Sequence, residues 1–286
     1  MTKAILPAKL LLRNLYKCLS QRTSWQDILH IDRATGSDLE WWRSTLTVWN
    51  ARHVAKKCKD LAHITTDASQ SGWGATLTMA TDHNALSKYE AQGFWLRKTD
   101  TKSSNCREIK AVLLALLAFL PLAKNKSIQL LSDNISTVAY INFQGGPSQD
   151  LTDITVQIWE VILIFNIDLK ASHLAGRLNG EADGLSRANS RHEWMLHPGL
   201  FRYLDIQWGP HTIDRFASMN VTLLPKYNSR YADPLCRSID ALYQQDRGLE
   251  NKFVNAPLGL MDAVLQIIET QQATATVVAQ KWRAKR

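Results

Sequence analysis

The stretch ITTDASQSGWGATL, residues 64–77, predicts the first two strands of a β-hairpin. β-Branched residues lead into Asp67, and Ser and Gly residues separate them from a second strand-like run. Asp and Ser favour turns because their side chains bond nearby backbone amides, and Gly72 and Gly74 allow positive φ or the close approach of another group. Asp67 therefore has a structural explanation, and only the rest of the chain can show whether its carboxylate has a chemical role.

The segments after this hairpin alternate between strand-like and helix-like patterns. A run of good helix formers is apolar all round, which predicts a buried helix that ends at Pro121. The expected elements are a third strand GFWLRK (93–98), the long helix SSNCREIKAVLLALLAFLP (103–121), a strand SIQLLSDN (127–134), helices STVAYINF (136–143) and DITVQIWEVILIFN (153–166), and a strand and loop IDLKASHLAG (167–176). Three strands followed by alternating helices and strands predict an α/β fold with a mixed five-stranded sheet flanked by helices.

Composition restricts the class of protein. The chain has 286 residues, 45% of them hydrophobic, and a net charge of +8, which favours either a polyanionic partner or simple solubility. Its four cysteines, at positions 18, 58, 106 and 236, have no metal-site or disulfide spacing, which indicates a reducing intracellular setting. The apolar stretch at residues 10–12 is too short to span a bilayer, so no membrane partner is expected.

Two flanking regions differ in texture from the central one. Residues 1–62 look helical, and the helix period places Leu39, Trp42, Leu46 and Trp49 near one face, as in a packing subdomain. After residue 190 the segments shorten and most of the prolines occur. We expect an N-terminal helical subdomain (1–62), a central domain (63–190) and a smaller C-terminal α/β domain (191–286).

Four acidic residues fall at the ends of the central elements: Asp67, Glu108, Asp133 and Asp183. Each has a structural explanation. Glu108 lies three residues after Asn105, which is capping-box spacing, and Asp133 is placed to cap the next helix. Asp183 fits a solvated surface charge.

Taken together, the acids predict a metal site. In a mixed sheet the first and fourth strands are commonly central neighbours, and a long helix packs across them, so three acids can meet at one edge. Clustered carboxylates stay ionised only with cations between them, and oxygen ligands suit Mg²⁺ or Mn²⁺. Two such ions about 4 Å apart would activate water and stabilise the leaving oxygen in phosphodiester hydrolysis.

Four segments together resemble the ribonuclease H (RNase H) domain of retrotransposon reverse transcriptases, most closely that of DIRS-type elements. They are TDASQSGWGATL, SSNCREIKAVLLAL, LLSDNISTVAYIN and SHLAGRLNGEADGLSR, and the likeness covers residues 63–188. It implies an RNase H fold in which Asp67, Glu108, Asp133 and Asp183 bind two Mg²⁺ ions, with Mn²⁺ as an alternative. His173 lies ten residues before Asp183, where related enzymes carry a loop histidine that delivers protons or releases product. A lone histidine can equally be structural.

The flanks resemble neighbouring parts of the same elements. DLEWWRSTLTVWNAR looks like the segment between the polymerase thumb and RNase H, and the sequence contains no YxDD-like polymerase turn. Residues 195–282 resemble a Dam-type adenine methyltransferase through TIDRFASMNVTLLPKYNS and FVNAPLGLMDAVLQIIE. The tetrapeptide Asn255, Ala256, Pro257 and Leu258 stands where active members carry an aromatic that stacks on a flipped adenine, and Leu258 has no such face. We expect a degenerate, inactive domain.

The resemblance implies a Mg²⁺-dependent endonuclease that cuts the RNA strand of an RNA–DNA hybrid, with a polymerase domain of the same polyprotein as a further partner. Recognition would use shape and 2′-hydroxyls. Asn105 and the backbone at Ser69 are candidate hybrid contacts. Lys98, Lys102 and Arg107 are phosphate contacts or ordinary surface charges.

The leading alternative is a noncatalytic nucleic-acid-binding remnant of such an element, against which the four intact acids argue. A DDE-type transposase would lack the HLAGRLNGEAD loop, and an adenine methyltransferase would need an aromatic residue at Leu258. The cytosol and the nucleus both remain open as compartments.

Overall fold

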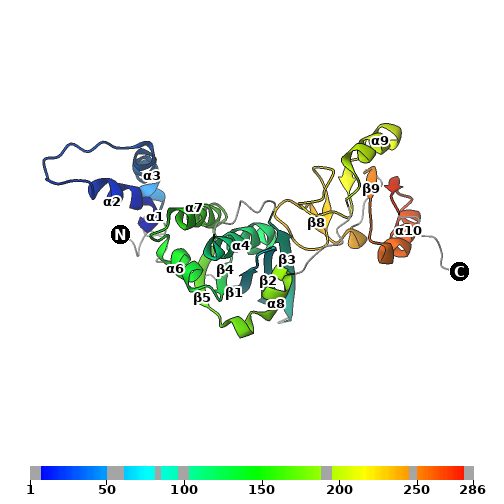
Figure 1. Cartoon of the computed structure of the whole chain (residues 1–286), viewed down its shortest axis with the longest axis horizontal. Helices are drawn as coiled ribbons and strands as arrows, with labels where there is room; N and C mark the ends of the chain where they lie inside the picture. Colours follow the sequence, from blue (N-terminus) through cyan, green and yellow to red (C-terminus); the bar gives the residue numbers. More distant parts are fainter. Residues whose placement is uncertain are drawn as a thin grey trace.

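The computed structural model describes residues 8–49, 61–80, 85–95, 103–187, 195–244 and 250–279. Figure 1 shows a central sheet with its helices, the N-terminal helices beside α7, and the C-terminal region beyond the other side of the sheet. Within the described ranges, no helix combines the length and the apolar character needed to cross a membrane.

The central sheet has five strands in the order β3-β2-β1-β4-β5. β1, β2 and β3 pair antiparallel, whereas β4 lies parallel to both β1 and β5. The predicted mixed sheet is therefore confirmed, with the first and fourth strands as neighbours. The strands are β1 (Leu61–Ala68), β2 (Gly72–Ala80), β3 (Leu86–Phe94), β4 (Ser127–Ser132) and β5 (Asp168–His173).

The third strand was predicted in the wrong place. Residues 93–98 were expected to form it, but β3 ends at Phe94, and residues 96–98 lie outside the described part of the chain. β3 is an edge strand with alternating exposed and partly buried residues, including Lys88 and Glu90. Edge strands carry charged residues that discourage pairing with other chains, and such a sequence lacks the apolar alternation of a buried strand.

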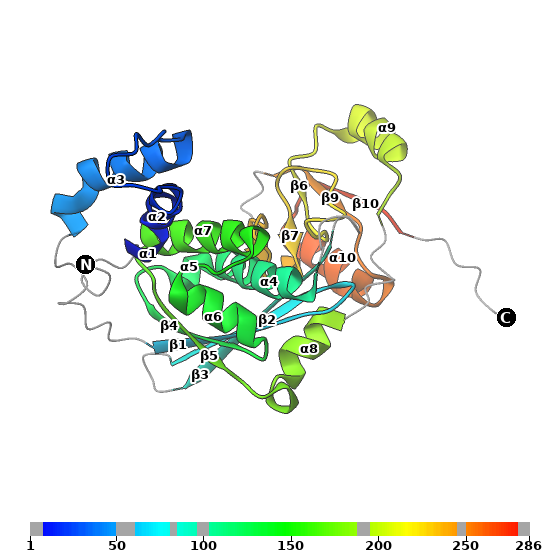
Figure 2. The same cartoon turned by 60° about the vertical axis from the view of Figure 1, so that its left-hand side comes forward.

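The helices between residues 103 and 187 are α4 (Ser104–Ala118), α5 (Leu120–Ala123), α6 (Ile135–Phe143), α7 (Gln149–Ile164) and α8 (Gly180–Arg187). Figure 2 shows α4, α6 and α7 over the sheet and α8 apart from them, and α8 packs against β2 and β1. α4 is buried as predicted, with Ile109, Val112 and Leu116 in the core. Pro121 does not end it, because α4 stops at Ala118 and the proline sits in the first turn of α5.

The N-terminal helices are α1 (Ala8–Leu11), α2 (Arg13–Leu19) and α3 (Arg33–Trp49). α1 and α2 contact the loop after α6, and α3 packs against α1 and α2. The backbone N–H of Leu10 donates to Gln144 Oε1 at 3.1 Å, and Trp42 Nε1 donates to the carbonyl of Leu11. On the expected apolar face of α3, Trp42 is half-buried, whereas Leu39 and Leu46 are 37% and 39% exposed, so the described residues cover that face only in part. The side chain of Trp49 lies outside the described residues.

The C-terminal region forms a smaller α/β arrangement. Its parallel sheet has the order β10-β9-β6, and its backbone meets the edge of the central sheet where Ala232 N–H donates to the carbonyl of Glu90 at 3.1 Å. The elements are α9 (Pro198–Trp208), β6 (Ile213–Asp214), β7 (Asn228–Ser229), β8 (Ser238–Ile239), β9 (Lys252–Val254), α10 (Met261–Thr270) and β10 (Ala275–Val277).

Candidate active site

Three of the four predicted acids meet at one edge of the central sheet. Asp67 is next to the last residue of β1, Asp133 directly follows β4, and Glu108 lies on α4. β1 and β4 are parallel neighbours, so their carboxyl ends lie side by side. One carboxylate oxygen from each residue lies within 4.8 Å of those from the other two.

The site concentrates negative charge in a buried place. Asp67 and Glu108 are 6% and 7% exposed. Burial, followed by the charges of Asp67 and Asp133, raises the pKa of Glu108 to about 8. Burial is also the main cause that raises the pKa of Asp67, with Asp133 and Asp183 adding to it. The carboxylates of Asp67 and Glu108 therefore favour binding a proton, and a metal cation could take the place of that proton.

The donor atoms fit a divalent metal ion. All three candidate ligands are carboxylate oxygens, the donors that Mg²⁺ and Mn²⁺ prefer. Glu108 Oε2 is buried and has no hydrogen-bond partner among the described residues. A buried oxygen of this kind costs free energy unless a cation or proton satisfies it, so the residues present suit an ion better than they suit a metal-free core.

The expected capping explanations for two of the acids are wrong. Ser103, not Asn105, caps α4, because its Oγ accepts the backbone N–H of Cys106. Asn134, not Asp133, caps α6 by accepting the N–H of Thr137. In both helices another polar residue is the N-cap, so the side chains of Glu108 and Asp133 are free of a capping role and contribute to the acidic cluster.

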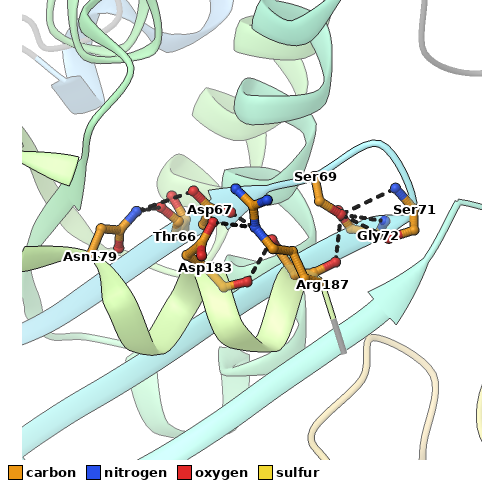
Figure 3. A network of polar contacts seen from close by, with 9 residues as sticks. Thr66, Asp67, Ser69, Ser71, Gly72, Asn179, Asp183 and Arg187 are labelled. Carbon is orange, nitrogen blue, oxygen red and sulfur yellow. Dashed lines mark hydrogen bonds and ion pairs between the residues drawn. The ribbon is translucent and has the colours of Figure 1, made fainter. Parts of the chain in front are cut away.

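Asp67 is held by two residues at and just before α8. Ser186 Oγ on α8 donates to Asp67 Oδ2 at 2.6 Å. Asn179 Nδ2 donates to Asp67 Oδ1 at 3.3 Å and to the carbonyl of Thr66 at 3.2 Å (Figure 3). Outer partners of this kind fix the direction of a ligand and tune its basicity.

Gly74 lets α8 come this close. It pairs directly with Asp67 across β1 and β2. A Cβ at Gly74 would lie 2.4 Å from the carbonyl oxygen of Ala182 and 2.5 Å from the backbone nitrogen of Ser186. The close approach that the sequence allowed at Gly74 is therefore used, and the approaching group is the backbone of α8.

The fourth acid, Asp183, is not part of the three-residue cluster. It lies on α8, 39% exposed, and its Oδ1 accepts a hydrogen bond from Arg187 Nε at 2.6 Å (Figure 3). Its charge still reaches the cluster, since it contributes to the raised pKa of Asp67.

The other candidate residues lie around this edge. His173 is exposed at the end of β5 and pairs with Ser132, the residue before Asp133. The Oγ of Ser69 donates to the carbonyl of Ser186, and the backbone of Ser69 helps to close the turn between β1 and β2 (Figure 3). Asn105 Oδ1 accepts from Asn134 Nδ2 at 2.8 Å, which ties the start of α4 to the end of β4.

The three basic candidates are only partly described. Lys98 and Lys102 lie outside the described residues. Arg107 is half-buried rather than a free surface charge, and its positive charge opposes the rise in the pKa of Glu108.

Asn179, Ser186 and Arg187, which contact Asp67 or Asp183, were not among the site residues predicted from the sequence. A local signal exists for the last two, since they stand three and four residues after Asp183 and share its face of a helix. Nothing local points from Asn179 or Ser186 to Asp67, because 112 and 119 residues separate the partners.

The tetrapeptide on which the sequence resemblance to a methyltransferase rests directly follows β9. Asn255, Ala256 and Pro257 lead into Leu258, whose side chain is 59% exposed. A cavity of about 30 Å³ between this sheet and α10 is lined mainly by apolar side chains, together with Arg215 and Lys252.

Some solved structures are similar to part of this chain. No family model matches the chain, and no curated protein matches it. RNase H1 from Halobacterium salinarum is 15% identical over 44% of this chain and 92% of its own, with a TM-score of 0.34. LC11-RNase H1, isolated from compost and solved with an RNA/DNA hybrid, is 13% identical over 44% of this chain and 93% of its own, also at 0.34. The foamy viral protease-reverse transcriptase with an RNA/DNA hybrid is 12% identical over 66% of this chain and 29% of its own, at 0.32.

Proposed function

We propose that this chain is a metal-dependent endonuclease that cuts the RNA strand of an RNA–DNA hybrid and leaves 3′-hydroxyl and 5′-phosphate ends. The observation that carries the proposal is the meeting of Asp67, Glu108 and Asp133, whose ligand oxygens lie within 4.8 Å of one another. Such a cluster does not stabilise the fold, because three neighbouring carboxylates repel one another and burying two of them costs free energy.

The acids would hold Mg²⁺ or Mn²⁺, and Asp183 would complete the set for a second ion. Such ions supply an activated water and stabilise charge on the leaving oxygen. Ser186 and Asn179 keep the carboxylate of Asp67 in one orientation, so its direction is fixed before an ion arrives. His173 is exposed and pairs with Ser132, the residue before Asp133, and we propose that it would donate a proton to the leaving 3′-oxygen or assist product release.

The net charge of the chain and the geometry of an A-like duplex support the proposed substrate. A net charge of +8 favours a polyanion, and an A-like duplex is recognised through its shape and 2′-hydroxyls rather than its base edges. Asn105 at the start of α4 and the backbone of the turn at Ser69 are the contacts we propose for the hybrid, with Arg107 near a phosphate.

We further propose that the chain derives from a DIRS-type retroelement polyprotein and works beside a polymerase domain of that polyprotein. Its domains would be a helical connection-like segment (1–62), the RNase H domain (63–190) and a degenerate adenine-methyltransferase-like domain (191–286). The sequence resemblance supports this assignment, and Leu258 supports the loss of methyl transfer because no aromatic face is present to stack on a base.

The test is cleavage of an end-labelled RNA–DNA hybrid in Mg²⁺ by the full chain, with single-stranded RNA and duplex DNA as negative substrates. The matched pair of variants is Asp133→Asn at the site and Asp153→Asn, an exposed acid of α7. We expect cleavage of the hybrid alone, lost in Asp133→Asn and kept in Asp153→Asn. Binding of the hybrid by the wild type without cleavage in Mg²⁺ or Mn²⁺ would replace this proposal with the noncatalytic remnant.

A further inference from the structure

Arg187 places a positive charge where a second metal ion would be expected to act. Its Nε lies 2.6 Å from Asp183 Oδ1, one helical turn away on α8. The pair is exposed, with side-chain exposures of 69% for Arg187 and 39% for Asp183. The carboxylate that stands apart from the three-acid cluster is thus the one that already has a cation.

The influence of Arg187 extends past its own partner. Its charge also acts on Asp67 and lowers the pKa of that carboxyl, opposing the negative neighbours. In the other direction, both Asp183 and Asp67 raise the pKa of Arg187. Arg187 therefore offsets part of the negative charge on the side of the site that faces α8.

We propose that Arg187 is a built-in counter-ion, which occupies Asp183 when no second divalent ion is bound and must release it before that ion can bind. This inference rests on the proposed nuclease function and adds a regulatory element to it: the ion pair lowers the affinity of the second metal ion and leaves that of the first nearly unchanged. The first ion depends on Asp67, Glu108 and Asp133, none of which Arg187 contacts in an ion pair.

The packing of α8 allows the exchange to occur through side chains alone. Ser186 is hydrogen-bonded to Asp67, and the helix backbone rests on Gly74, so the helix itself is anchored. Arg187 is on the solvent side and can swing away without uncovering any core. Exposed ion pairs are weak, which makes this one replaceable by a divalent cation, whereas a buried pair would resist replacement.

The experiment counts ions in the absence of substrate. Mn²⁺ is titrated into the full-length wild type, Arg187→Gln, Arg187→Lys, Asp183→Asn and the double variant Arg187→Gln/Asp183→Asn, by calorimetry and by electron paramagnetic resonance of free Mn²⁺. We expect two classes of site in the wild type. Arg187→Gln should tighten the weaker class by about three- to tenfold, because an ion-pair competitor and a like charge are both removed. Arg187→Lys keeps the charge and should bind like the wild type.

The Asp183→Asn variants provide the internal control. The weaker class should disappear in both, so that Arg187→Gln has no further effect when Asp183 is absent. Unchanged Mn²⁺ affinity in Arg187→Gln, or an equal gain in affinity at both classes of site, would contradict the proposed role of Arg187 as a counter-ion. Thermal unfolding without metal checks that each variant is folded.

This outcome can be separated from failure of the nuclease proposal. If the wild type cuts the hybrid and Arg187→Gln leaves both Mn²⁺ affinities unchanged, the counter-ion is wrong and the nuclease stands. If neither the wild type nor any variant cuts the hybrid, the nuclease proposal is wrong. Tighter Mn²⁺ binding at the weaker site of Arg187→Gln would still establish that a metal ion replaces Arg187 at Asp183.

Discussion

Two buried aspartates stand at strand ends in this chain, Asp67 on β1 of the central sheet and Asp214 on β6 of the C-terminal sheet. They are 6% and 2% exposed, and burial is the largest cause that raises the pKa of each, to about 6 for Asp214. By burial and pKa alone, the two residues are equally good candidates for a functional role.

The groups around the two aspartates distinguish them. Asp67 has Glu108 and Asp133 within 4.8 Å through their ligand oxygens, and other carboxylates raise its pKa. Asp214 has backbone N–H groups from Leu223 and Phe216, which lower its pKa. Backbone donors suit a structural carboxylate, whereas converging acids create a need for a cation. A perturbed pKa thus becomes evidence for a metal site only when the groups around it are acids.

The largest difference between the two aspartates should be in activity. Asp67→Asn should reduce hybrid cleavage by more than about 100-fold, since loss of an outer partner already costs up to that much and Asp67 is itself a proposed ligand. Asp214→Asn should leave the cleavage rate within about twofold of wild type and change thermal stability instead. Steady-state cleavage and thermal unfolding of the two variants measure both effects. A large loss of activity in Asp214→Asn with an intact fold would remove the distinction.

The next effect concerns pH and stability. The pKa of Glu108 is raised from 4.5 to about 8, so the folded metal-free protein holds a proton that the unfolded chain releases. The contribution of Glu108 to the stability of the metal-free protein should therefore be largest below pH 4.5 and be lost as the pH rises through 8. Glu108→Gln should remove this loss, with a gain of up to roughly 5 kcal/mol above pH 8.

Denaturant unfolding without metal, at several pH values, tests Glu108→Gln against the wild type. Mn²⁺ should stabilise the wild type increasingly over the same pH range, because the ion replaces the proton, and should stabilise Glu108→Gln far less. Stability of the metal-free wild type that rises between pH 5 and 8, with no change in slope in the variant, would contradict the assignment.

A smaller effect is expected for the orientation of Asp67. Ser186→Ala removes the 2.6 Å hydrogen bond to Asp67 and should weaken the tighter Mn²⁺ site by about tenfold, at the low end for an outer partner. Ser127→Ala is the matched control, because Ser127 Oγ donates to Asp168 at 3.3 Å at the other end of the parallel strands. Calorimetric Mn²⁺ titration of both variants should show a change only in Ser186→Ala.

The smallest effect should come from the tetrapeptide after β9. Leu258 is 59% exposed, so Leu258→Ala should change stability by less than about 0.5 kcal/mol and leave hybrid cleavage unchanged. Restoring an aromatic with Leu258→Tyr should not produce methylation of adenine in DNA if the domain is degenerate. Methyl transfer by the wild type, measured with a labelled methyl donor, would show that this strand end is a second active site.

Much of the central fold could be predicted from local patterns. The order of strands and helices, the burial of α4 and the positions of Asp67, Glu108 and Asp133 at element ends all follow from residues close in sequence. β3 could not be located, because an exposed edge strand with Lys88 and Glu90 lacks the apolar alternation that marks a buried one.

The sequence by itself determined which residues are acidic, where the hairpin turns and that α4 is apolar enough to be buried. Only the tertiary structure decided that Gly74 lies under α8 and that Asn179 and Ser186 hold Asp67. The physical reason is range. Helix and strand patterns depend on residues a few positions apart, whereas the support for Asp67 comes from partners 112 and 119 residues away, which the pairing of the strands and the docking of α8 bring together.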